Sequence, residues 1–138
     1  MTAHCAIESF EGVRVSPARQ RRGQRAYRAG VAAEGCIERL YESRGMRIEA
    51  RRFRGARGEI DLIVRDGAAL VFIEVKQSRD FDRAAESLSE RQMMRICGAA
   101  EEYLAREPQE LMTECRFDVA LVDARGGTRV LENAFGLF

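Results

Sequence analysis

The sequence predicts one α/β domain whose elements follow in the order helix, three strands, helix, strand and a short final strand. Two stretches carry apolar residues at helical spacing, and the stretches beside them alternate or run apolar as strands do. An Asp-Gly pair at positions 66 and 67 separates two of the apolar runs and indicates a β-hairpin. At 138 residues the chain has the length of one domain, so a single hydrophobic core should suffice.

The first helix is expected at residues 24–44. Its apolar positions are Ala29, Ala33, Cys36, Ile37 and Leu40. Gly45 follows, where a residue with a left-handed backbone often caps a helix. Between positions 46 and 51 apolar residues alternate with charged ones, which is the period of a half-exposed strand. We place the domain at residues 24–138, after a basic arm at residues 1–23 for which disorder is one interpretation.

The hairpin is the next expected element. Residues 60–64 and 70–75 are rich in β-forming side chains and flank Asp66 and Gly67, both of which tolerate positive φ. If these two are the turn residues, the strand pairing follows by counting outward from the turn.

A second helix and two more strands complete the predicted order. The sequence offers this helix two candidate capping boxes, Ser87 with Glu90 and Ser89 with Gln92. Its apolar side comprises Leu88, Met93, Ile96, Ala100, Tyr103 and Leu104. Pro108 lies beyond the end of this helix. Residues 115–122 are then expected to form a strand, Gly126-Gly127 a turn, and residues 129–131 the short last strand.

Composition excludes several classes of protein. Charged residues make up 33% and hydrophobic residues 46%, which is typical of a globular domain rather than a disordered or membrane protein. The amino terminus lacks a secretory pattern, so we expect a cytoplasmic protein. The four cysteines are scattered without zinc-site or disulfide spacing. His4 is the only histidine, which argues against histidine-based catalysis or metal binding.

Arginines form two clusters although the net charge is only +1. The first cluster, in a stretch without acids, contains Arg14, Arg19, Arg21, Arg22, Arg25 and Arg28. The second contains Arg47, Arg51, Arg52, Arg54 and Arg57. Such clusters could bind nucleic-acid phosphates, and we take Arg51, Arg52, Arg54 and Arg57 as the candidates. The alternative is an unstructured arm followed by a solvated strand face.

Carboxylates gather on the predicted hairpin. With Asp66 and Gly67 in the turn, Asp61 lies opposite Phe72 and Glu59 opposite Glu74. Asp61 is then a diagonal neighbour of Glu74 on the same face, within about 5 to 8 Å at Cβ. Two carboxylates about 5 Å apart repel by roughly 3 kcal/mol at an effective dielectric of about 20, so a cation or a shifted pKa must compensate. A solvated strand face is the plain alternative.

Oxygen ligands of this kind favour Mg²⁺, or the similar Mn²⁺, which the backbone carbonyl of Val75 would help to hold. Such an ion activates water and neutralises charge on a phosphoryl group. Lys76, next on the face of Glu74, would orient the water. It is the one lysine among 23 Lys and Arg residues. A compact ammonium with a movable pKa suits this position, whereas a planar guanidinium would not. Chance retention of a single lysine in a GC-rich genome is the alternative.

An ordered set of motifs resembles the YraN-like family of uncharacterised bacterial proteins, itself similar to the restriction-endonuclease-like PD-(D/E)XK superfamily that includes archaeal Holliday junction resolvases. The matching hairpin segments are Gly58-Glu59-Ile60-Asp61-Leu62-Ile63 and Leu70-Val71-Phe72-Ile73-Glu74-Val75-Lys76. Matching positions outside the hairpin are Gly30, Ala33-Glu34, Gly45, Arg91-Gln92, Ala99-Ala100, Tyr103-Leu104, Arg116-Phe117-Asp118 and Asn133-Ala134-Phe135. Gln77-Ser78-Arg79 and Arg91 depart from the family pattern, which affects the expected substrate contacts rather than the metal site.

The resemblance implies a restriction-endonuclease-like fold with a central mixed sheet and flanking helices. It also implies a metal site at Asp61, Glu74 and Lys76, with a fourth acid at Glu34, which could equally be an ordinary surface residue. The expected activity is divalent-metal-dependent hydrolysis of DNA, with branched or damaged DNA among the candidate substrates. A homodimer would suit the cutting of both strands. The alternative is a catalytically inactive module that binds nucleic acid or a protein partner.

Overall fold

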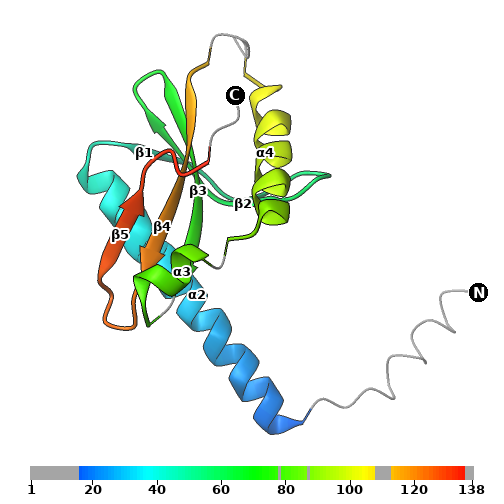
Figure 1. Cartoon of the computed structure of the whole chain (residues 1–138), viewed down its shortest axis with the longest axis vertical. Helices are drawn as coiled ribbons and strands as arrows, with labels where there is room; N and C mark the ends of the chain where they lie inside the picture. Colours follow the sequence, from blue (N-terminus) through cyan, green and yellow to red (C-terminus); the bar gives the residue numbers. More distant parts are fainter. Residues whose placement is uncertain (1–15, 78, 87, 108–112, 136–138) are drawn as a thin grey trace, which may run out of the picture. The chain divides into compact units, whose positions relative to one another are not determined.

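The two apolar runs around positions 66 and 67 form the central hairpin of a five-stranded sheet in the computed structural model of the chain (Figure 1). The structure describes residues 16–77, 79–86, 88–107 and 113–135. The strands are β1 (Arg47–Arg54), β2 (Glu59–Asp66), β3 (Ala69–Gln77), β4 (Cys115–Val122) and β5 (Thr128–Leu131). They lie side by side in that order, and all neighbours are antiparallel except β3 and β4. The sheet is therefore mixed, which agrees with the restriction-endonuclease-like fold class.

Three helices accompany the sheet in the described part of the chain. They are α2 (Pro17–Ser43), α3 (Phe81–Glu86) and α4 (Glu90–Leu104). Helix α2 begins at Pro17 rather than near position 24, and Gly45 follows it with the expected left-handed backbone, at φ +86°. The part of the predicted arm at residues 1–15 lies outside the described residues.

The two helices that follow β3 differ in how well the sequence predicted them. Helix α4 starts at the predicted Ser89 with Gln92 capping box, in which each side chain accepts a hydrogen bond from the backbone of the other residue. The alternative cap, Ser87, lies outside the described residues. Helix α3 was not predicted, because six residues are too few to show a helical period.

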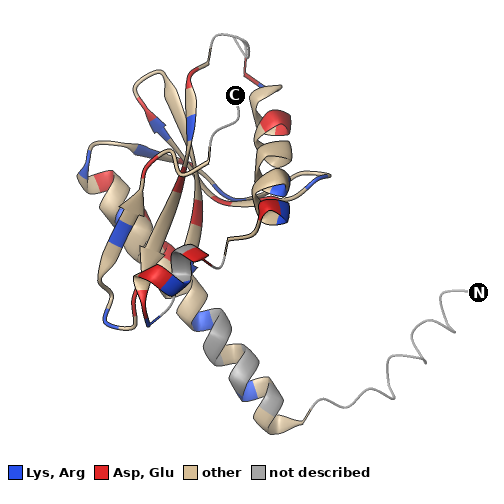
Figure 2. Cartoon of the chain, in the orientation of Figure 1, with Lys and Arg blue, Asp and Glu red and all other residues tan. Residues whose placement is uncertain are grey.

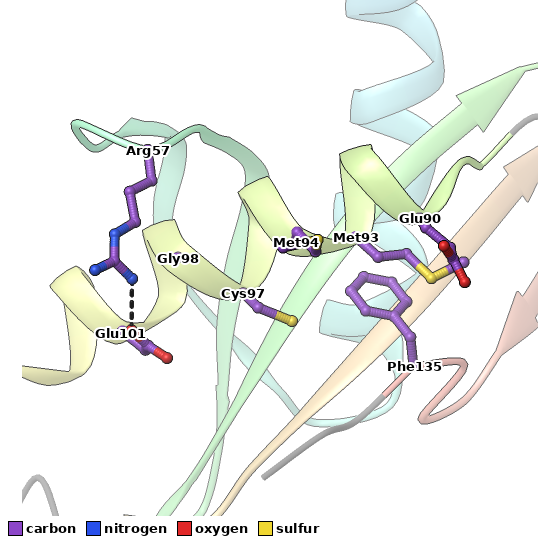
Figure 3. A pocket seen from close by; sticks show the side chains of 8 residues that line it. All are labelled: Arg57, Glu90, Met93, Met94, Cys97, Gly98, Glu101 and Phe135. Carbon is purple, nitrogen blue, oxygen red and sulfur yellow. Dashed lines mark hydrogen bonds and ion pairs between the residues drawn. The ribbon is translucent and has the colours of Figure 1, made fainter.

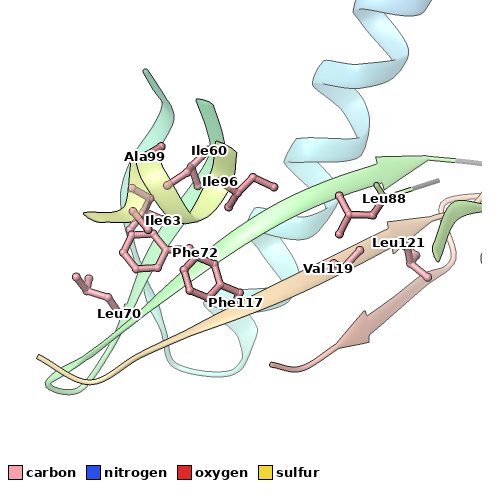
Figure 4. Close-up of a cluster of buried hydrophobic side chains, with 11 residues drawn as sticks. Ile60, Ile63, Leu70, Phe72, Leu88, Ile96, Ala99, Phe117, Val119 and Leu121 are labelled. Carbon is pink, nitrogen blue, oxygen red and sulfur yellow. The ribbon is translucent and has the colours of Figure 1, made fainter. Parts of the chain in front are cut away.

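Two hydrophobic layers cover the two faces of the sheet. One layer packs beneath α4 and is drawn in Figure 4; it includes Phe72 and Phe117, whose rings stack at 5.3 Å between centroids. The other layer packs beneath the second half of α2 and includes Ile37, Tyr41 and Val71. Burying one such side chain stabilises the fold by about 1.5–3 kcal/mol. Side chains along a strand therefore point alternately toward α4 and toward α2. The face on which a residue lies decides which helix it can contact.

The chain divides into two compact units, residues 1–31 and 32–138. All five strands, α3, α4 and the second half of α2 belong to the second unit. Among the described helices, none is long and apolar enough to cross a lipid bilayer.

Candidate active site

The hairpin turn lies one residue later than the sequence suggested. Gly67 and Ala68 are the turn residues, whereas Asp66 and Gly67 were predicted. Gly67 has φ +61° and Ala68 does not have positive φ, which matches a type II′ turn with glycine in its first central position. Arg65 consequently pairs with Leu70 instead of Ala68. This shift of two residues leaves the side chains of the paired residues, 62–66 and 69–73, on their predicted faces, because side chains alternate with a period of two.

The corrected register makes Asp61 and Glu74 direct neighbours across the hairpin. The paired ladder ends at Leu62 and Ile73, so Asp61 and Glu74 are the next facing residues, not a diagonal pair. Asp61 Oδ2 accepts a hydrogen bond from the backbone N–H of Val75 at 2.9 Å. This bond satisfies a strand donor that would otherwise need a backbone partner. The Asp61 carboxylate is thereby fixed against β3.

Strands β1 and β2 are both irregular at the level of Asp61. Ile60 and Ile63 contribute to the same hydrophobic layer, although a regular strand would place residues three apart on opposite faces. On β1, Ala50 and Phe53 also pack against that one layer. Arg52, between them, has φ +51°, an uncommon backbone for a residue with a side chain. Arg52 falls opposite Asp61, between the pairs Arg51–Leu62 and Phe53–Ile60, so the two departures lie side by side.

Burial and like charge act on the carboxyl pair. Burial, followed by the charge of Asp61, raises the pKa of Glu74 to about 8. Burial also raises the pKa of Asp61, while the Val75 N–H and a hydrogen bond with the Glu74 carboxyl act in the opposite direction. Lys76 Nζ lies 3.7 Å from Glu74 Oε1 and partly offsets the negative charge. The structure therefore brings together Asp61, Glu74 and Lys76, as the sequence predicted.

Glu34, the fourth acid implied by the family resemblance, lies on the α2 side of this group. Its carboxylate accepts a hydrogen bond from Arg52 Nε at 3.3 Å, and its side chain is 22% exposed. Burial raises the pKa of Glu34, and the negative charge of Asp61 contributes to the rise. The charges of Glu34 and Asp61 therefore interact, but the Glu34 carboxylate forms an ion pair with the guanidinium of Arg52.

The four arginines predicted to bind nucleic acid all form ion pairs with glutamates. The pairs are Arg51 with Glu38 at 2.7 Å, Arg52 with Glu34 at 3.3 Å, Arg54 with Glu59 at 3.7 Å and Arg57 with Glu101 at 2.9 Å. Figure 2 shows basic and acidic residues interspersed on the same helices and strands. Phosphates would therefore have to compete with glutamates for these arginines, an effect that the linear sequence did not reveal.

Helix α4 adds two residues that the sequence analysis did not assign to the site. A cavity of about 160 Å³ is lined by Glu59, Glu74, Gln92, Arg95 and Ile96. The capping motif predicted where Gln92 would lie on its helix, but its approach to Glu74 depends on how α4 packs on the sheet. No local pattern in the sequence shows that contact.

A larger cavity, of about 540 Å³, contains none of the predicted metal or catalytic residues (Figure 3). It runs along the exposed side of α4, past Met93, Met94 and Cys97, and Phe135 forms its opposite wall. The Arg57–Glu101 ion pair lies at one end and Glu90 at the other. Its two acids, Glu90 and Glu101, thus lie at opposite ends of a lining that is otherwise mostly apolar, and Glu101 is paired with Arg57.

Asp118 is fully buried but lies outside this site. Tyr41 donates a hydrogen bond to its Oδ2 at 2.7 Å, and the backbone N–H of Asn133 donates to its Oδ1 at 3.0 Å. Arg116 Nε completes the set at 3.1 Å from Oδ1. With its oxygens satisfied, Asp118 ties β4 to α2 and to the turn after β5, a structural role for two of the sequence motifs.

The donor set fits a hard cation that keeps part of its water. Among the described residues, no group of three or more His, Cys, Asp or Glu side chains could hold a metal ion. Asp61 and Glu74 supply two carboxylates, and the carbonyl of Val75 lies between Glu74 and Lys76 in the chain. Mg²⁺ binds through one or two carboxylates and completes its shell with water and substrate phosphate, whereas a structural zinc site needs four protein ligands.

Comparison with known proteins gives a consistent family match. The model of the uncharacterised protein family UPF0102 matches residues 33–122. The chain is 58% identical over 115 residues to a UPF0102 protein of Ruegeria pomeroyi, covering 83% of this chain and 94% of that protein. It is 52% identical to one from Roseobacter denitrificans, with coverage of 85% and 91%. A UPF0102 protein of Dinoroseobacter shibae is 48% identical over 128 residues, with coverage of 93% and 96%.

Proposed function

The chain belongs to the uncharacterised protein family UPF0102, the YraN-like group, and from that premise we propose that it is a divalent-metal-dependent endonuclease that hydrolyses phosphodiester bonds of DNA. The observation that carries this proposal is the contact between the Asp61 and Glu74 carboxyl groups beside Lys76. In the absence of a cation, burial and the neighbouring Asp61 raise the pKa of Glu74 to about 8, which costs the fold free energy at neutral pH that a bound cation would restore.

Asp61 and Glu74 are the proposed side-chain ligands of Mg²⁺ or Mn²⁺, with the carbonyl of Val75 as a third ligand. The bound cation would lower the pKa of a water and neutralise charge that grows on the phosphoryl oxygens. A cation also supports the proposal energetically, because it would replace the repulsion between the two carboxylates with attraction. The hydrogen bond from Val75 N–H keeps the Asp61 carboxylate oriented before any ligand arrives.

Lys76 is the proposed group that positions the attacking water. Its Nζ lies beside Glu74 Oε1, and its side chain is only 21% exposed. An ammonium in that position donates hydrogen bonds to a water or to a phosphate oxygen, and it has no acceptor capacity of its own. Glu34 takes part only after its carboxylate separates from Arg52, so we assign it a supporting role.

The proposed substrate is DNA, with branched or damaged forms included, and the proposed assembly is a homodimer that cuts both strands. The test is a cleavage panel of branched, nicked and single-stranded DNA, with an RNA strand for comparison, in the presence of Mg²⁺ or Mn²⁺. Asp61→Asn and Lys76→Ala should abolish cleavage while circular dichroism and DNA binding measured in EDTA stay unchanged. Asp66→Asn is the matched control, since Asp66 is an exposed acid on the same strand.

Cleavage by Asp61→Asn and Lys76→Ala at the rate of the Asp66→Asn control would contradict the proposal. Salt-sensitive DNA binding without metal-dependent cleavage of any substrate would instead favour a catalytically inactive binding module. Sedimentation of the protein with and without duplex DNA tests the homodimer separately.

A further inference from the structure

We propose that Arg95 and Gln92 of α4 form a binding site for a backbone phosphate of the nucleic acid, in the cavity they share with Glu74. This inference rests on the proposed endonuclease function and adds to it a named contact for the substrate. Neither residue belongs to the acid and lysine set that carries the proposed chemistry.

The cavity places a guanidinium and an amide beside the proposed metal ligand. Arg95 and Gln92 line it from α4, and Glu59 and Glu74 line it from the sheet. Its volume of about 160 Å³ accommodates a phosphate group with water. A phosphate that bridges a cation on Glu74 and the guanidinium of Arg95 would have positive charge on both sides.

Arg95 differs from the arginines that the sequence singled out. Each of Arg51, Arg52, Arg54 and Arg57 is paired with a glutamate, as described above. Arg95 is exposed and forms no ion pair or side-chain hydrogen bond with the residues that the structure describes. Its guanidinium can therefore bind a phosphate without breaking an ion pair with these residues. The contact costs less free energy than one at the four paired arginines.

Close backbone contacts fix Arg95 relative to the catalytic hairpin. A Cβ at Gly58 would lie 2.6 Å from the carbonyl oxygen of Arg95, so glycine allows the loop before β2 to approach α4 directly. One turn further on, Arg57 covers Gly98 and pairs with Glu101. These contacts place Arg95 on a helix that is anchored to the strand carrying Asp61, which is how a precise phosphate contact is best supported.

Gln92 presents its amide for the same purpose. Its Oε1 accepts the backbone N–H of Ser89 at 3.2 Å within the capping box. That bond uses the oxygen and orients the side chain of Gln92, which lines the cavity, and the NH₂ group remains as a donor. Contacts to a backbone phosphate carry no sequence information, so the site predicts binding that is independent of sequence.

The experiment measures binding and cleavage by Arg95→Gln, Arg95→Lys and the control Arg125→Gln. Arg125 is an exposed arginine between β4 and β5 and does not line the cavity. Binding to a short DNA duplex is followed by fluorescence anisotropy in Ca²⁺ over a salt series, and cleavage is followed in Mg²⁺. Arg95→Gln should bind about tenfold more weakly, and its negative slope of log K against log salt should become smaller in magnitude by about 1.

The further variants and kinetics separate phosphate binding from a structural role. Arg95→Lys should keep the wild-type salt slope because the charge remains, and recover part of the affinity. Arg95→Gln should raise KM more than it lowers kcat, with unchanged thermal stability. If Arg95→Gln binds and cuts like Arg125→Gln while the wild type is active, the phosphate site is refuted and the endonuclease proposal stands. Binding that depends on Arg95 without any cleavage would support the site and contradict the endonuclease.

Discussion

Replacing Glu74 by glutamine should stabilise the metal-free protein at neutral pH while it removes activity. Glutamine keeps the volume of the side chain and can donate its amide N–H to the Asp61 carboxylate. In the wild-type protein, the pKa of Glu74 is raised from 4.5 to about 8, mainly by burial and then by Asp61. Because the raised value belongs to the folded state, folding binds a proton between those pH values, so stability falls as pH rises through that range.

The magnitude follows from the same shift. One proton gives a slope of at most about 1.4 kcal/mol per pH unit, so near pH 7 the wild-type protein loses on the order of 3 kcal/mol compared with pH 4.5. Glu74→Gln should not lose this free energy of unfolding. For a domain of this size, a difference of that order corresponds to roughly 10 °C in Tm. Below pH 4.5 Glu74 is protonated in both the folded and the unfolded state. It then contributes no pH dependence, and the stabilities of the two proteins should vary with pH in the same way.

The assay is thermal and urea denaturation in EDTA from pH 4.5 to 8.5, followed by circular dichroism. Glu42→Gln, which changes an exposed acid on α2, is the control and should follow the wild type. Mg²⁺ at pH 8 should then stabilise the wild type and the control but not Glu74→Gln, because only the first two keep both carboxylates. If the stability of Glu74→Gln and that of the wild type depend on pH in the same way, the claim that folding raises the pKa of Glu74 is refuted.

Further predictions concern stability. Asp118→Ala should lower the free energy of unfolding by about 3–5 kcal/mol, because it leaves Arg116 and the Tyr41 hydroxyl without their buried partner; urea denaturation measures this. Gly58→Ala should cost about 1–3 kcal/mol, because its Cβ would meet the backbone of Arg95. Gly30→Ala, where nothing lies within 4 Å, should instead be neutral or stabilise the helix by up to about 1 kcal/mol. Equal Tm values for the two glycine variants would contradict the proposed loop contact.

Local patterns predicted most of the fold because the features that set it are local. The period of the apolar residues located α4 and all five strands, and Gly45 marked the end of α2. The hairpin was recognised correctly but its turn was not. Asp66-Gly67 suits a turn with positive φ at both positions, whereas the chain uses Gly67-Ala68 with positive φ at glycine alone. The choice between the two depends on strand register, which packing on both faces decides.

The candidate site was predictable to the extent that it lies on one hairpin. The error of two residues turned a diagonal neighbour into a direct one, so it did not separate Asp61 from Glu74, and Lys76 lies two residues after Glu74 on β3. Arg95 could not be found in the same way, because only the packing of α4 on the sheet brings it to Glu74. The ion pairs of the β1 arginines were missed for the same reason, since Glu34 and Glu38 approach them from α2.

Those ion pairs bear on how the protein would bind a polyanion. A phosphate that takes Arg52 must displace Glu34, and the released carboxylate then stands within electrostatic reach of Asp61. Without a cation this exchange adds repulsion to the acid pair, but with a divalent cation the freed carboxylate gains attraction. Binding of the metal and binding of the nucleic acid should therefore favour each other, by the same factor in either direction. A protein of this design would hold DNA weakly until the metal is present, which limits cleavage to the complete complex.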